Sequence, residues 1–226
     1  MTTVARPVAR PRGRSWQYGQ LGELRGVLIW SYGAVAAGLL VPIAARLRWG
    51  IPTENFLRDP AAITGAPPYV GLFSNVGVLL WAAAATICLF VAVLVGRSSG
   101  ARLAFWWYAG VLTLALLIDD LFLFHEVVFP YHLHVPEPLV YAAYGLATAG
   151  FLALFHRRIL GTDAVLLGLA LAWFAASLAV DHWGHLWLPR GFFLVEDGLK
   201  LLGIVSWLLY FARTGYSEAR ALALGH

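Results

Sequence analysis

Residues 70–95 read VGLFSNVGVLLWAAAATICLFVAVLV and contain no Asp, Glu, Lys or Arg. An apolar stretch of about 20 residues is long enough for one α-helix to cross a bilayer. Comparable stretches recur along the chain, separated by segments rich in Pro, Gly and Arg that favour turns. We therefore predict an all-α bundle of six transmembrane helices, at about 26–45, 70–95, 103–128, 138–156, 163–188 and 192–213.

The composition supports this class of fold. The 226 residues are 60% hydrophobic and 12% charged, whereas a soluble domain has about 25% charged residues. We predict a basic arm at residues 1–25, a membrane domain at 26–213 and a short tail at 214–226. The single cysteine, Cys88, excludes an internal disulfide and is expected in the core.

The distribution of arginines predicts the orientation. Cytoplasmic loops carry an excess of Lys and Arg, and the side that contains the N-terminal arm collects most of the arginines. They are Arg6, Arg10, Arg12, Arg14, Arg25, Arg97, Arg102, Arg157, Arg158, Arg213 and Arg220. Both termini are therefore predicted to be cytoplasmic, in a bacterial-type inner membrane. The arm is expected to meet anionic lipid headgroups or a partner subunit. No folded basic module accompanies it, which argues against nucleic-acid binding.

Three apolar stretches carry ionisable residues. They are residues 118–126 (IDDLFLFHE), 181–185 (DHWGH) and 196–200 (EDGLK). Each such group inside a bilayer costs roughly 2.5–3.5 kcal/mol on insertion scales. In the predicted topology all three stretches lie in the outer half of the membrane, so we expect them to form one buried site. Helical phase places Asp119 and Glu126 on one face, with Asp120 and His125 turned elsewhere.

The residue types in this site are compatible with a metal. Asp181, His182 and His185 offer oxygen and nitrogen ligands, and Glu196 from the next span could complete a set for zinc or non-haem iron. A polar network that only holds the helices together is the alternative interpretation. Asp119 and Glu126 are predicted as a general base or as metal-bridging carboxylates, or else as a hydrogen-bonded pair in a wet crevice. Lys200, the only lysine, is the expected counter-charge, with Glu196 or Asp197 as its partner.

Two functional hypotheses follow, and whether the protein is an enzyme stays open. The first is a metal-dependent membrane enzyme, a hydrolase or an oxidase, that acts on a lipid-like substrate. The second is a non-catalytic accessory subunit of a larger membrane complex. A proton path is a third hypothesis, but the third, fifth and sixth predicted spans carry no acidic residues in their inner halves to continue it.

Overall fold

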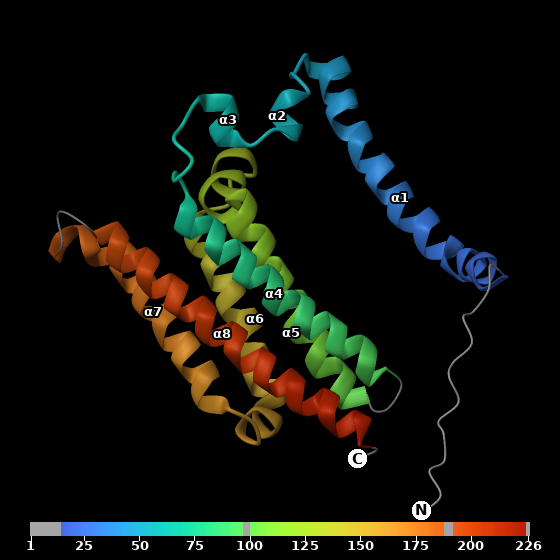
Figure 1. Cartoon of the computed structure of the whole chain (residues 1–226). Coiled ribbons are helices and arrows are strands. Elements are labelled where there is room, and N and C mark those ends of the chain that lie inside the picture. The colour runs from blue at the N-terminus through green and yellow to red at the C-terminus, as the bar shows by residue number, and fades with distance from the viewer. Residues whose placement is uncertain (1–14, 97–99, 188–191, 225–226) are drawn as a thin grey trace, which may run out of the picture. The chain divides into compact units, whose positions relative to one another are not determined.

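The computed structural model describes residues 15–96, 100–187 and 192–224, and leaves aside the side chains of residues 15–23 and 184–187. All regular elements in these ranges are helical (Figure 1). They are α1 (Ser15–Trp49), α2 (Glu54–Leu57), α3 (Pro60–Thr64), α4 (Leu72–Val95), α5 (Gly100–Phe122), η1 (Phe124–His132), α6 (Glu137–Leu160), α7 (Ala164–Trp187) and α8 (Phe192–Ala223). The chain divides into two compact units, Met1–Val70 and Gly71–His226.

Several helices have the length and composition of membrane spans. Within the described residues five segments qualify: Leu24–Trp49, Leu72–Val95, Gly100–Phe122, Glu137–Leu160 and Ala164–Trp183. This is the pattern of a multi-pass helical membrane protein. Helix α8 was predicted as a sixth span but is not among them, because charged side chains interrupt its apolar sequence.

The first unit is dominated by one long helix. Helix α1 starts at Ser15, so residues 15–25 of the predicted arm are helical, while Arg6, Arg10, Arg12 and Arg14 lie outside the described residues. Only 6% of its candidate span is buried. The short helix α3 begins where the Asp59 carboxylate accepts a hydrogen bond from the Ala61 amide at 2.7 Å, with Pro60 at its first position. Both features favour a helix start.

The second unit is a bundle of five long helices. Helix α8 packs against α7 on one side and α4 on the other, α4 also packs against α5, and α6 contacts α5 and η1 (Figure 1). The Trp207 indole on α8 donates a hydrogen bond to the Thr113 hydroxyl on α5 at 3.0 Å. The Tyr108 hydroxyl on α5 donates to the Ala147 carbonyl on α6 at 2.8 Å. These two hydrogen bonds join α8 to α5 and α5 to α6 through residues of the aromatic core.

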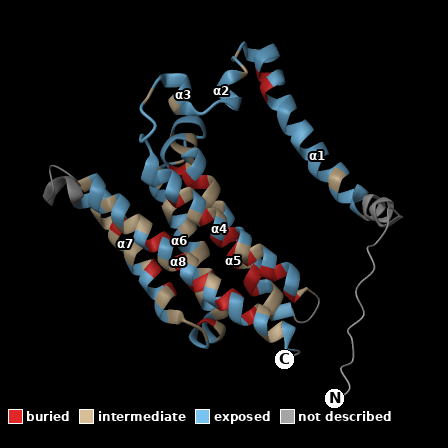
Figure 2. Cartoon of the chain, in the orientation of Figure 1, coloured by how far each residue is buried: buried red, intermediate tan, exposed pale blue. Residues whose placement is uncertain are grey.

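The core lies along the middle of this unit, where buried residues follow α4, α5 and α8 (Figure 2). Its largest buried side chains are aromatic: Phe105, Trp106, Phe151, Trp207, Tyr210 and Phe211. Helices α7 and α8 approach closely at Gly203, where an added Cβ would lie 2.5 Å from Cε1 of Phe174. Small residues permit such close contact between membrane helices.

Candidate functional site

A break in the chain after α5 creates the site. The predicted span 103–128 is wrong at its end, because α5 stops at Phe122 and Leu123 takes a left-handed conformation, with φ 53° and ψ 43°. This conformation costs an L-residue roughly 1–2 kcal/mol. The nine residues of η1 then continue as a π-helix, a form that is rare and frequent at functional sites. The break redirects the residues that follow it toward α5.

The first consequence is a buried pair. Asp119 and His125 are 6% and 7% exposed, and the His125 Nδ1 donates a hydrogen bond to Oδ2 of the Asp119 carboxylate. The expectation that His125 faces away from Asp119 is therefore wrong, because it assumed an unbroken helix through Leu123. The second carboxylate oxygen, Oδ1, is buried and has no hydrogen-bond partner among the described residues.

Glu126 lies on the other side of the same imidazole. Its Oε1 is 3.4 Å from Nε2 of His125, and its side chain is 53% exposed. Asp119 and Glu126 thus do not pair directly, as their shared helical phase suggested, but flank the two ring nitrogens of one histidine. The ring centroids of His125 and Tyr141, a residue of α6, are 5.3 Å apart.

This arrangement defines the chemistry open to His125. With Nδ1–H donating to the Asp119 carboxylate, Nε2 is directed toward the half-exposed Glu126 carboxylate and is the ring nitrogen left to bind a proton or a metal ion. A carboxylate that holds an imidazole in one tautomer is the usual support of a metal-ligating or proton-accepting histidine. Helical phase assigned His125 a secondary role, and the only sequence signal for the pair is the short spacing between Asp119 and His125.

A second buried acid lies next to the first. The Lys200 ammonium on α8 donates to Oδ1 of Asp120 at 2.5 Å, and the Asp120 side chain is 8% exposed. Gly77 on α4 leaves room for it, since an added Cβ there would lie 3.8 Å from Asp120 Oδ2. We expected Lys200 to pair with Glu196 or Asp197. In the structure its partner is Asp120. A buried carboxylate has lost its hydration, so it depends on a counter-charge more strongly than a carboxylate that is exposed to water.

The remaining predicted ligands come from α7 and α8. Asp181 and His182 are exposed, Glu196 is partly buried, and the His185 side chain lies outside the described residues. Glu196 is close enough to Asp181 and Glu126 for their charges to interact, so the three acidic stretches do gather at one end of the unit. Among the described side chains, however, no three of His, Cys, Asp and Glu are arranged to hold a metal ion together.

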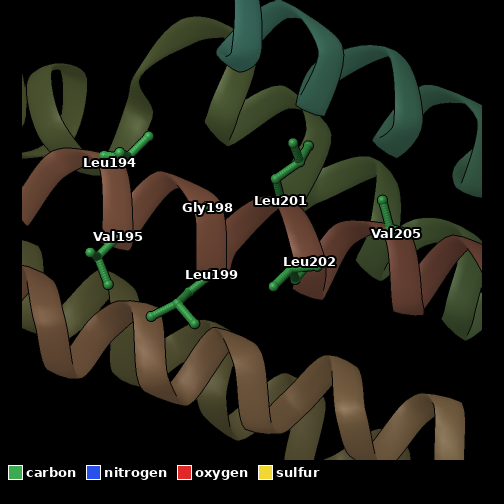
Figure 3. Close-up of a pocket in the computed structure, with 7 residues that line it drawn as sticks. All are labelled: Leu194, Val195, Gly198, Leu199, Leu201, Leu202 and Val205. Carbon is green, nitrogen blue, oxygen red and sulfur yellow. The ribbon is translucent and has the colours of Figure 1, made fainter.

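The outer face of α8 is separate from this polar end. An open apolar hollow of about 470 Å³ runs along it (Figure 3), lined by Leu194, Val195, Gly198, Leu199, Leu201, Leu202 and Val205. Lys200 lies about 200° around the helix from both Gly198 and Leu202, so it faces the bundle while the hollow faces outward. The hollow therefore does not form a part of the site.

The fold and the site together define a helical membrane protein with an ionisable cluster at one end of its second unit. The chain belongs to the family described as a domain of unknown function, DUF8692, whose model matches residues 32–214. The match begins within α1 and ends within α8, so it extends over both units. Neither the curated proteins nor the solved structures contain a match to the chain.

Proposed function

We propose that this protein is a membrane-embedded, metal-dependent enzyme of the bacterial inner membrane. In this proposal α8 is the sixth span and both termini are cytoplasmic, in agreement with the arginine distribution. The metal centre lies at the end that carries His125, Glu126 and Glu196, in the outer half of the bilayer. The substrate is lipid-like, because a site between membrane helices is most directly reached from the bilayer.

One observation carries the metal part of the proposal. Two ligands of one tetrahedral zinc ion, each about 2.1 Å from the metal, are separated by about 3.4 Å. The His125 Nε2 and Glu126 Oε1 atoms are 3.4 Å apart. His125 also donates its other ring N–H to a buried carboxylate, which is the support that metal-ligating histidines almost always have. His125 and Glu126 are therefore the first two ligands.

Further ligands would come from α7 and α8. Glu196 and Asp181 contribute charge at the same end, and His182 and His185 follow Asp181 by one and four residues on α7, within about one helical turn. Zinc or iron held by three such groups would lower the pKa of a bound water and supply a nucleophile for hydrolysis. Asp119, which we expected to act as a base, is instead a positioning residue for His125.

Metal analysis of the purified full-length protein tests this proposal. After incubation with zinc or iron salts and removal of excess metal, we expect about one bound ion per chain in the wild type. His125→Ala should abolish this binding, and Asp119→Asn should weaken it roughly 10- to 100-fold. His132→Ala removes an exposed histidine from the same π-helix and should bind metal normally. A wild-type protein that retains neither metal would exclude the metal centre.

An accessory role in a larger complex is a second proposal, favoured by α1. This helix carries an apolar candidate span of 26 residues, Leu24–Trp49, and an apolar membrane helix can pack against a helix of a partner subunit as well as against lipid. If the role is correct, mild detergent extraction from the native membrane should yield an assembly larger than one chain, with the basic arm protected from trypsin. A uniform monomer with an arm open to trypsin would contradict it.

A further inference from the structure

The opposite end of the second unit holds a buried ionic cluster. Glu218 on α8 accepts hydrogen bonds from Nε of Arg102 on α5 at 2.7 Å and from Nη2 of the same residue. It also accepts one from Nη2 of Arg158 on α6. The Glu218 side chain is 8% exposed, and the Arg158 guanidinium lies 4.8 Å from the centroid of the Phe105 ring. Three helices are thus joined at one carboxylate.

A polar hollow adjoins this cluster. It has a volume of about 460 Å³ and is lined by Gly161, Thr162, Asp163, Arg213, Thr214, Ser217, Glu218 and Ala221. Its floor lies where the candidate span Glu137–Leu160 ends and the span Ala164–Trp183 begins. The hollow therefore opens at the level where the membrane meets water, which is the level of lipid headgroups.

Two polar groups at this end are buried, and one of them can only donate. Nε of Arg158 and Oγ1 of Thr214 are buried and have no hydrogen-bond partner among the described residues, while the nearby Tyr210 hydroxyl pairs with Thr162 at 3.1 Å. A guanidinium N–H can only donate, and a buried donor without an acceptor is costly. Such a group is expected to have an acceptor, such as an ordered water. Arg158 does not line the hollow, so of these two groups only the Thr214 hydroxyl belongs to a lining residue.

The charges at this end also favour an anion. Both carboxylates that line the hollow are already neutralised: Glu218 by Arg102 and Arg158, and Asp163 by Nε of Arg213 at 2.6 Å. Together with Arg102 and Arg158, which pair with Glu218 but do not line the hollow, three guanidinium groups against two carboxylates leave a net charge of +1, and the exposed Arg157 adds to it. Guanidinium and hydroxyl groups together are the usual protein partners of phosphate oxygens.

We propose that this hollow binds a phosphate group, which Thr214, Ser217 and Arg213 hold. The phosphate is carried either by the headgroup of an anionic phospholipid or by a free anion. Basic pockets between membrane helices are known to take lipid headgroups. The proposal is independent of the metal centre, which lies at the other end of the unit.

The test measures the melting temperature of the full-length protein in lipid nanodiscs at constant ionic strength. One arm replaces part of the phosphatidylcholine with phosphatidylglycerol, and the other adds inorganic phosphate in place of chloride. In the wild type we expect the melting temperature to rise with the ligand concentration, as for any ligand that prefers the folded state. A rise with phosphatidylglycerol alone identifies the headgroup, and a rise with inorganic phosphate identifies a free anion.

Variants separate this site from general charge attraction. The double variant Thr214→Val and Ser217→Ala should bind the ligand more weakly. The ligand concentration that gives half of the melting-temperature shift should rise at least tenfold. Arg220→Gln removes an exposed arginine that does not line the hollow. This variant should need almost the same ligand concentration as the wild type for half of the shift. If the double variant does not fold, Arg213→Gln serves instead. No shift in either arm, or equal shifts in the variants and the wild type, would overturn the proposal and leave an ordered water as the acceptor.

Discussion

Glu218→Ala is expected to lower the free energy of unfolding by about 3–5 kcal/mol, the range observed when one partner of a buried ion pair is removed. The substitution leaves Arg102 and Arg158, which both donate to Glu218, facing each other without a carboxylate. It also releases the contact that joins α5, α6 and α8. Thermal or denaturant unfolding in detergent, followed by tryptophan fluorescence, measures the loss.

A matched control is available at the same end of the unit. Asp163→Ala removes the carboxylate of the pair with Arg213, whose two side chains are 44% and 64% exposed. Exposed pairs contribute little to stability, so this variant should unfold close to the wild-type temperature. If Glu218→Ala unfolds as Asp163→Ala does, the cluster is not buried in the way that the structure indicates.

Asp120→Ala is expected to have the second-largest effect, a loss of about 2–3 kcal/mol. It leaves the Lys200 ammonium without its partner on α5, and the value is placed below the range for fully buried pairs because Lys200 is 36% exposed. The measurement is the same unfolding experiment. Since the metal centre proposed above uses His125 and Glu126, metal binding by the folded variant should be preserved.

A double variant tests whether the loss comes from the pair. Asp120→Leu combined with Lys200→Met replaces both charges by apolar side chains of similar length, a change that is often neutral in buried pairs. It should recover most of the stability lost in Asp120→Ala. If the double variant is as unstable as the sum of both single variants, the two side chains do not interact, and the contact between α5 and α8 has another origin.

The helices themselves could be predicted, because uninterrupted apolar length is a strong local signal. Five predicted spans correspond to described helices of suitable length and composition. The gathering of acidic stretches at one end also followed from an alternating up-and-down topology. The break at Leu123 could not be predicted, because nothing in the sequence FLFHE marks a left-handed residue: leucine is rarely found there and no glycine or proline is present.

The side-chain partners could not be predicted for a related reason. Helical phase ranks residues only along one unbroken helix, so it separated Asp119 from His125, which the break brings together. It likewise favoured Glu196 for Lys200, since both are on one helix, although the lysine pairs with Asp120 on another. The Glu218 cluster joins residues up to 116 positions apart, and such contacts depend on the packed structure.

Helix α5 contributes one charged residue to the cluster at each end of the second unit, so the distance between them can be compared with the thickness of a bilayer. Arg102 and Asp119 are 17 positions apart on it, which corresponds to about 26 Å along the helix axis. The hydrocarbon core of a typical bilayer is about 30 Å thick. The protein thus suits a thin membrane or a slight local compression, and a thicker one would draw one ionic cluster into hydrocarbon. Lipid chain length should therefore affect the stability of this protein through hydrophobic mismatch.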